Sequence, residues 1–139
     1  MTCLLTPFKE QHLLELDYQE PLKVSRDTLF SLGRFYSHWP AWSALRDDKV
    51  IGSAGMYYVA PGHFAAWAAL STELLCDYPL WLHRQIVKGL NEAVAFLPAR
   101  LVTAKVLTDQ QRYHRWLRQL GFSERGVVGR FTTYAREFV

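Results

Sequence analysis

The longest run of helical spacing in the chain falls between Asp77 and Leu97. Apolar residues recur there every three or four positions, and charged and amide side chains occupy the opposite side, as in a helix that covers a core. Pro79 stands near the expected start and Pro98 just beyond the expected end. The pattern therefore predicts one long amphipathic helix. Its apolar side consists of Leu82, Ile86, Leu90, Ala93, Val94 and Leu97.

A second helix is expected over Thr108–Leu120. Thr108 and Gln111 have the spacing of a capping box at its start. Gly121 follows the last apolar residue, where a glycine commonly ends a helix in the left-handed conformation. A strand expected at Arg100–Val106 separates this helix from the first. The apolar side of the second helix consists of Tyr113, Trp116, Leu117 and Leu120.

Segments rich in β-branched, aromatic and small apolar residues alternate with turn residues elsewhere in the chain. Gly52 and Gly55 fall inside one of these segments and predict a bulge or a close backbone approach there. The last hairpin is expected to turn at Gly126–Gly129. Strands are expected at Thr2–Leu5, Trp42–Arg46, Lys49–Val59, Phe64–Leu75, Phe122–Arg125 and Arg130–Phe138.

Two further helices are expected in the first forty residues. One would begin at a Thr6 cap, with Pro7 in its first position, and run to about Leu16 before the chain breaks at Pro21. The other would begin after Ser25 and show helical spacing of its apolar residues. The element order is therefore β-α-α-β-β-β-α-β-α-β-β, which predicts a single α/β domain with a mixed sheet of six or seven strands.

Composition limits the class of protein. Half of the 139 residues are hydrophobic, which is enough for one domain with a sizeable core. No apolar run reaches the roughly 20 residues that cross a bilayer, so no membrane contact is expected. The first residues reach Lys9 and Glu10 too early for a signal peptide. Cys3 and Cys76 form no paired motif, so we expect reduced thiols in the cytoplasm. The five histidines lack metal-ligand spacing, so no metal site is expected.

Charge is distributed unevenly along the chain. Residues 1–77 carry six Lys and Arg against nine Asp and Glu, whereas residues 78–139 carry ten against four. A basic second half favours an anionic partner, such as cofactor phosphates, nucleic acid or an acidic protein surface. Arg112, Arg115 and Arg118 form a basic stripe, with His114 beside it, but no nucleic-acid-binding module accompanies it. A solvated helix face is the preferred interpretation of this stripe.

Residues 113–122 read YHRWLRQLGF, which is a helix that closes on Gly121 and Phe122. This ending, together with the strand and helix order from Trp67 onward, resembles the GNAT superfamily of N-acetyltransferases. The likeness covers nearly the whole chain in element order. Within the superfamily, the pattern is most similar to the GNAT-like internal virion proteins of short-tailed phages. Those proteins share the compact first half, a long helix entered without a glycine loop, and a leucine where enzymes often have tyrosine.

The resemblance implies a fold in which two parallel strands, here Phe64–Leu75 and Arg100–Val106, splay apart to bind acetyl-CoA. Backbone groups at the splay would pair with the pantetheine arm. A glycine-rich loop would present N–H groups to the pyrophosphate at the tip of the next helix. The acceptor would be an amine on a small molecule or a protein. The implied cofactor-binding candidates are Leu74, Leu75, Cys76, His83, Arg84, Lys105 and Asp109, with Gln110 as the alternative to Asp109.

The chain departs from the enzymes of the superfamily at the loop and at the acid. The loop of residues 75–80 has no glycine, and Asp77 would cap the helix tip that a pyrophosphate uses. Leu117 stands where the enzymes often have a tyrosine acid, and Tyr113, one turn earlier, is the candidate acid. Glu73 is the candidate base. The structural alternatives are an exposed or arginine-paired carboxylate for Glu73 and a core tyrosine for Tyr113.

Two functions therefore stay open from the sequence. One is an acetyl-CoA-dependent N-acetyltransferase with an altered cofactor loop. The other is a GNAT-fold phage protein without catalysis, which would act in virion structure, in assembly or in binding a host protein, in the host cytoplasm or the virion. Nucleic-acid binding by the basic half is a third and weaker interpretation. An oligomer is compatible with each of them. The tryptophans at positions 39, 42, 67 and 81 exceed the needs of a small core, so one or two are candidates for a partner interface.

Overall fold

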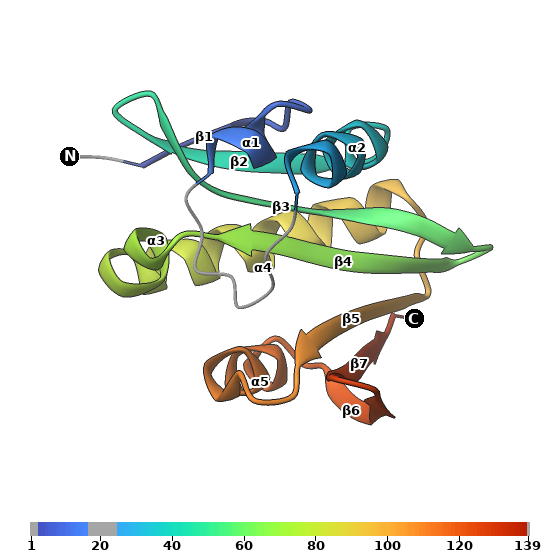
Figure 1. Ribbon diagram of the computed structural model, residues 1–139. Helices are drawn as coiled ribbons and strands as arrows, with labels where there is room; N and C mark the ends of the chain where they lie inside the picture. The colour runs from blue at the N-terminus through green and yellow to red at the C-terminus, as the bar shows by residue number, and fades with distance from the viewer. Residues whose placement is uncertain (1–2, 17–24, 139) are drawn as a thin grey trace.

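The computed structural model describes residues 3–16 and 25–138 (Figure 1). They build a seven-stranded sheet with the order β1-β2-β3-β4-β5-β7-β6, in which β4 and β5 run parallel and the other neighbours are antiparallel. The predicted element order is observed, with one short helix added after β4. The elements are β1 (Leu4–Pro7), α1 (His12–Glu15), α2 (Arg26–Tyr36), β2 (Ala41–Arg46), β3 (Lys49–Ala60), β4 (His63–Leu70), α3 (Thr72–Asp77), α4 (Pro79–Phe96), β5 (Leu101–Leu107), α5 (Gln111–Gln119), β6 (Ser123–Val128) and β7 (Phe131–Glu137).

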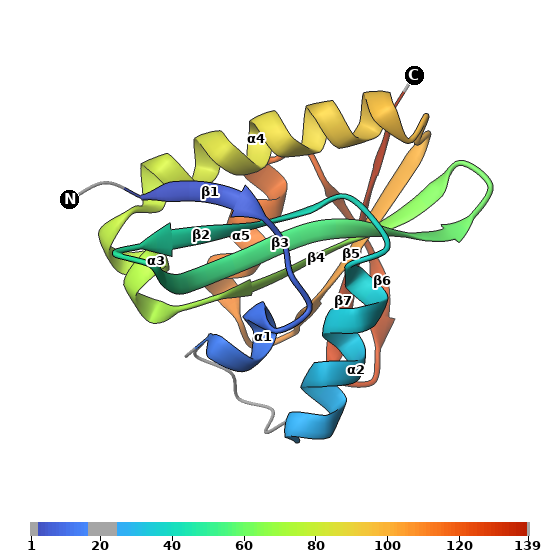
Figure 2. The ribbon, with the colours of Figure 1, turned by 90° about the horizontal axis from the view of Figure 1, so that it is seen from above.

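Helices cover both faces of the sheet. α1 and α2 lie on one face and α4 on the opposite one, as seen from above in Figure 2. α5 shares a core cluster with α4, in which Leu90 and Ala93 of α4 and Leu117 and Leu120 of α5 pack with Val102 of β5. The apolar sides predicted for the two longest C-terminal helices are buried or partly buried, so both predictions are confirmed.

The first predicted helix is wrong over most of its length. Thr6 and Pro7 belong to β1, and α1 forms only a single turn ending one residue before Leu16. Pro7 is tolerated because β1 is an edge strand, where a missing N–H faces no partner. The start predicted for α2 is confirmed, since the Ser25 hydroxyl accepts a hydrogen bond from the Thr28 N–H at 3.1 Å. The predictions at residues 1–2 and at residue 21 lie outside the described residues.

The strand predicted at Phe64–Leu75 ends at Leu70. Ser71 begins a helix instead, because its hydroxyl accepts a hydrogen bond from the Leu74 N–H at 3.1 Å. Its carbonyl oxygen accepts another from the Leu75 N–H at 3.2 Å. Residues 72–77 are therefore helical rather than extended. The strand prediction failed here because the segment is short and the helix depends on the Ser71 cap.

The close approach predicted at the two glycines of β3 is confirmed. A Cβ atom on Gly52 would lie 2.4 Å from Cδ2 of Leu74, which comes from α3 on the α4 face of the sheet. A Cβ atom on Gly55 would lie 2.6 Å from the carbonyl oxygen of Pro40. Both contacts are too short for any side chain, so β3 can carry only glycine at these positions without a shift of its neighbours.

The capping box predicted for the last helix is absent. α5 begins at Gln111 after an N-cap at Gln110, and no side chain caps it. The Thr108 hydroxyl lies instead 3.0 Å from the Thr132 hydroxyl of β7. At the other end the prediction is confirmed, because Gly121 adopts a φ of 90°.

A buried histidine fixes the start of α5. Nε2 of His114 lies 3.2 Å from the Leu107 carbonyl oxygen and 3.0 Å from that of Thr108. Nδ1 lies 2.7 Å from the Tyr134 hydroxyl, which is fully buried in the core. Since Nε2 must donate to carbonyls, Nδ1 accepts the proton of the tyrosine. His114 thus ties α5 to β5 and β7, and it does not belong to the exposed basic stripe.

Candidate active site

Two parallel strands part in the middle of the sheet. β4 and β5 pair only at three positions, the last of which joins Ala65 to Thr103. Beyond this point β4 stays paired with β3 as far as Leu70, and β5 stays paired with β7 as far as Leu107. Each strand thus follows its outer neighbour, and the two diverge as Figure 1 shows. Main-chain groups that face the gap have no ladder partner there, so an extended ligand can pair with them.

A cavity of about 470 Å³ opens at this gap, on the face that α4 and α5 cover. Its walls at the gap come from β4 beyond Ala65, from residues 104–107 of β5 and from the first turns of α5. Most of the lining is apolar, and the polar contributions include Tyr113 and Gln110 from α5 and Lys105 from β5. Such a slot suits a chain of alternating apolar and amide groups more than a highly charged one.

The helix tip next to the gap differs from the expected phosphate loop. The residues after β4 form α3, in which the N–H groups of Leu74 and Leu75 are bonded to the hydroxyl and the carbonyl oxygen of Ser71. Asp77 is the last residue of α3 and does not cap α4, so the predicted Asp cap is wrong. The N-cap of α4 is Tyr78, no side chain caps this end, and Pro79 follows. The gap therefore fits a pantetheine arm, while the turn after β4 lacks the N–H cradle that a pyrophosphate takes in the resemblance.

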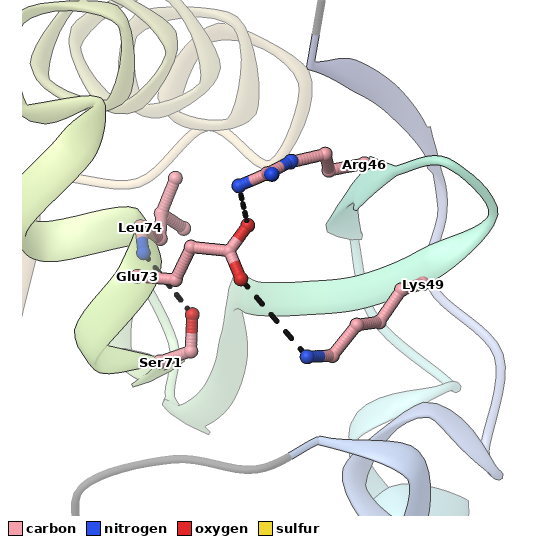
Figure 3. A network of polar contacts seen from close by, with 5 residues as sticks. All are labelled: Arg46, Lys49, Ser71, Glu73 and Leu74. Carbon is pink, nitrogen blue, oxygen red and sulfur yellow. Dashed lines mark hydrogen bonds and ion pairs between the residues drawn. The ribbon is translucent and has the colours of Figure 1, made fainter. Parts of the chain in front are cut away.

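Glu73 lies on α3, away from the cavity lining. Its carboxylate forms an ion pair with Arg46, and its other oxygen lies 4.0 Å from Nζ of Lys49 (Figure 3). The two basic side chains come from the β2–β3 hairpin, so the pair fastens α3 to that hairpin. The strand position predicted for Glu73 is wrong, and the arginine-paired alternative describes its surroundings.

Tyr113 lies on α5 at the cavity. Its ring is half-buried and lies 6.5 Å from the ring of Trp116. Leu117 lines the same cavity one turn later, so the tyrosine and the leucine share one face as the sequence predicted. Among the described residues that line the cavity, Tyr113 supplies the only phenol.

Comparisons with known proteins were made by sequence and by structure. No protein-family model and no curated protein matches the sequence. Solved structures do match. An acetyltransferase from Streptococcus agalactiae superposes with a TM-score of 0.78 at 14% identity, over 98% of each chain. A GNAT-family acetyltransferase from Bacillus anthracis gives 0.69 at 7% identity, over 97% of this chain and 94% of the other. A variant of the spermidine N-acetyltransferase from Vibrio cholerae gives 0.70 at 11%, over 96% and 94%.

The chain has the GNAT fold. Its α/β architecture, its mixed sheet and the splay of β4 and β5 are those that the resemblance implied, and the predicted fold class is confirmed. Identities this low bear on the fold, while the chemistry has to be argued from the residues of this chain. No helix among residues 3–16 and 25–138 is long and apolar enough to cross a membrane.

The GNAT fold brings some of the predicted cofactor-binding residues to the cavity. Leu74, Lys105 and the alternative Gln110 line it. Lys105 is exposed, with Nζ 6.0 Å from the centre of the ring of Phe131, which belongs to β7 and also lines the cavity. Asp109 is exposed next to Gln110 and does not line the cavity.

The remaining predicted residues lie outside the cavity. Nδ1 of His83 accepts a hydrogen bond from the Trp116 indole at 3.1 Å, so this histidine joins α4 to α5. Arg84 is exposed on α4, and Leu75 and Cys76 lie on α3. None of these four lines the cavity. No group of three or more possible metal ligands occurs in the described part of the chain.

Two kinds of site residue were not predicted. Nη1 of Arg112 lies 3.9 Å from Sγ of Cys76, so the first turn of α5 brings a cation beside the α3–α4 junction. The tryptophans at positions 42, 81 and 116 line the cavity, although they were expected in the core or at a partner surface. Trp67 borders it as well, but its ring stacks on that of Tyr36 of α2, with 4.1 Å between the ring centres, on the opposite face of the sheet. The indole N–H of Trp67 is buried and has no hydrogen-bond partner among the described residues. The excess of tryptophan was the one sequence signal for this lining.

Proposed function

We propose that this protein is an N-acyltransferase that uses an acyl-CoA thioester, with acetyl-CoA as the expected donor. The acceptor is an amine on a small molecule or a protein. The observation that carries the proposal is the divergence of β4 and β5 over an apolar cavity, because the three-residue ladder leaves main-chain groups available at its centre. The Vibrio cholerae structure, named for spermidine N-acetylation, supports an amine as the acceptor.

The proposed reaction is a direct transfer. The neutral amine nitrogen attacks the thioester carbonyl, a C–N bond forms, the C–S bond breaks, and the nitrogen releases its proton to solvent. The Tyr113 hydroxyl, which lines the cavity, gives its proton to the departing thiolate and is reprotonated by solvent. Main-chain N–H groups of β4 beyond Ala65 stabilise the charge that develops on the carbonyl oxygen. The N–H groups of Leu74 and Leu75 are bonded to Ser71 and do not take this role.

Phosphate binding is assigned to side chains. The turn after β4 offers no cradle, whereas Lys105 at the cavity and Arg112 beside the α3–α4 junction are basic and exposed. The N-terminus of α4 lacks a side-chain cap and adds a favourable dipole. Recognition by such charges is weaker and more sensitive to salt than a backbone cradle.

A non-catalytic use of the fold is the alternative, as a phage protein in virion structure, assembly or host-protein binding. Two observations favour it, namely Leu117 at the position where the enzymes often have tyrosine and a helix in place of the glycine loop. In this alternative the splay persists without turnover.

A titration with acetyl-CoA separates the two functions. At a concentration a hundredfold above its Kd, the ligand should raise the free energy of unfolding by about 2.7 kcal/mol. An unchanged melting temperature at millimolar acetyl-CoA would remove acetyl-CoA as the donor and favour the non-catalytic alternative.

Replacing the candidate acid tests the mechanism. The variant Tyr113→Phe keeps the ring and loses the proton, so kcat should fall by about a hundredfold. Its affinity for acetyl-CoA should stay within about twofold of the original. The matched control is Tyr58→Phe, because Tyr58 is exposed on β3 and does not line the cavity. Equal kcat values for the two variants would remove Tyr113 from the reaction.

A further inference from the structure

The cavity extends beyond the gap between β4 and β5. The same space continues beneath α4 to the opposite flank of that helix, where Trp81 and Gln85 face β1 and β2. There it is lined by Trp42 and Ala44 of β2 and reaches Leu5 on the edge strand. We call this part the side groove. Because β4, β3, β2 and β1 are successive neighbours, the side groove reaches about 14 Å from the gap, or three strand spacings.

Small residues form the floor of this space. Strand positions that face a covering helix usually carry large aliphatic side chains, since protein interiors are close-packed. Here the sheet presents methyl groups or bare backbone to α4 at the lining positions Ala44, Gly52, Ala54, Ala66, Ala68 and Ala104. The cavity therefore arises from missing side-chain volume along four neighbouring strands. Its volume of about 470 Å³ corresponds to roughly fifteen water molecules at liquid density.

A glycine in the roof enlarges the side groove. Gly89 lies in the interior of α4, where a glycine is unfavourable compared with alanine. The nearest atoms to a Cβ placed there would be those of the Trp42 ring, at 3.6 to 4.0 Å, which is an ordinary contact. Packing therefore does not require glycine at this position, in contrast to Gly52. The space that Gly89 leaves belongs to the cavity.

We propose that the side groove binds the hydrocarbon tail of the acyl group, so that the preferred donor is a medium-chain acyl-CoA rather than acetyl-CoA. The inference rests on the proposed function and specifies its donor. An acetyl group ends at the thioester and cannot reach β1 or β2, whereas a longer chain passes directly from the gap into the groove. The indole rings of Trp42 and Trp81 and the methyl floor give such a chain apolar contacts along its length.

The charges around the groove agree with this occupant. Lys88 and Glu92 lie at its outer margin on α4, and both are exposed to solvent. The lining between them and the gap includes the polar side chains of Gln85 and of Ser53, whose hydroxyl is hydrogen-bonded to that of Ser43, and is otherwise apolar. A polar or charged acceptor molecule would find few partners there, because buried polar groups require hydrogen bonds.

Calorimetric titration with acetyl-CoA and octanoyl-CoA tests the proposal on the full chain. Octanoyl-CoA should bind at least about tenfold more tightly than acetyl-CoA, since each buried methylene adds affinity. In the variant Gly89→Leu, whose side chain enters the groove, this preference should fall to about twofold or less while the Kd for acetyl-CoA stays unchanged. The matched control is Asn91→Leu, which adds the same side chain to the exposed face of α4 and should keep the preference.

The possible outcomes distinguish a failure of the acyl-chain inference from a failure of the proposed function. Equal Kd values for the two thioesters on the unmodified protein would overturn the acyl-chain inference and leave the proposed function standing. Loss of the preference in both leucine variants would also overturn it, because the effect would then be unrelated to the groove. Failure of both thioesters to bind would overturn the proposed function and the inference together.

Discussion

Two positions on opposite walls of the cavity carry glycine for different physical reasons. At Gly52 of β3 a Cβ atom would collide with the fully buried Leu74, and at Gly89 of α4 it would make only an ordinary contact. The first glycine is required by packing, and the second is not. A single added methyl group should therefore change stability in opposite directions at the two positions.

The two alanine variants make this a measurable pair. Gly52→Ala should lower the free energy of unfolding by about 1–3 kcal/mol, because an overpacked core must shift. Gly89→Ala should raise it by up to about 1 kcal/mol, since alanine is the better helix former. Urea unfolding followed by circular dichroism measures both. A loss of stability in Gly89→Ala similar to that in Gly52→Ala would show that packing, rather than a ligand, demands the second glycine.

Single residues were only partly predictable from the sequence. The close approach at Gly52 and the left-handed end at Gly121 follow from what glycine alone can do, and both were confirmed. The role of His114 was missed because a histidine between two arginines looks exposed. Only the carbonyl groups at the end of β5 and the hydroxyl of Tyr134, distant in sequence, show that it is buried.

At the scale of elements, the main difference between the candidate site and that of a glycine-loop enzyme is α3, which takes the place of the loop after β4. It is fastened at one end by the Ser71 cap and at the other side by the pair between Glu73 and Arg46. Leu74, between them, packs into the core opposite Gly52. These contacts explain why the residues after β4 form a helix, and we propose that Glu73 holds that helix and takes no part in the chemistry.

Neutralising Glu73 tests that assignment. Glu73→Gln should lower the free energy of unfolding by up to about 1 kcal/mol, as expected for a partly exposed ion pair, and should leave turnover nearly unchanged. Arg46→Gln should cost a similar amount, and the double variant should cost less than the sum of the two, since both remove one interaction. Urea unfolding measures the free energy of unfolding of each variant, and an acyl-transfer assay measures its turnover. A fall in kcat of a hundredfold in Glu73→Gln, at normal stability, would restore Glu73 as the base.

Elements were predictable where the apolar period is long and failed where it is short. The helix at Pro79–Phe96 covers five turns and was found with its ends nearly correct. The six residues of α3 contain three apolar or thiol-bearing side chains in a row, Leu74, Leu75 and Cys76, and a run this short looks the same in a strand. β1 extends two residues beyond the strand expected at Thr2–Leu5, because pairing with β2 outweighed the preference of Thr6 and Pro7 for a helix start.

At the scale of the whole molecule, the element order predicted the mixed α/β sheet, and the resemblance identified the fold. A parallel pair in mid-sheet follows from strand, helix and strand in succession, because the crossover returns the chain to the same edge. The divergence of β4 and β5 was implied by resemblance and is present. The size and direction of the cavity were not predictable, because they arise from small residues on four strands that only the sheet brings together.

The attachment of α1 to the sheet should make global stability depend on pH. Nδ1 of the buried His12 accepts the Lys9 N–H at 3.1 Å and lies 2.7 Å from the Ser43 hydroxyl, which in turn lies 2.8 Å from that of Ser53. Burial lowers the pKa of His12 below its ordinary value of 6.5, with Lys9 adding to the effect and Glu15 opposing it. The unfolded chain therefore binds a proton before the folded one does as pH falls.

The free energy of unfolding should then decrease as pH falls below 6.5, because the unfolded state binds more protons in that range. Guanidinium unfolding at about pH 7.5 and about pH 5.5 measures this loss. His12→Gln, which can still accept the Lys9 N–H and cannot titrate, should show a smaller loss over the same interval. His38→Gln, at an exposed histidine two residues after the end of α2, is the matched control and should behave as the original protein. An identical loss in His12→Gln and in the control would place the pH dependence elsewhere in the molecule.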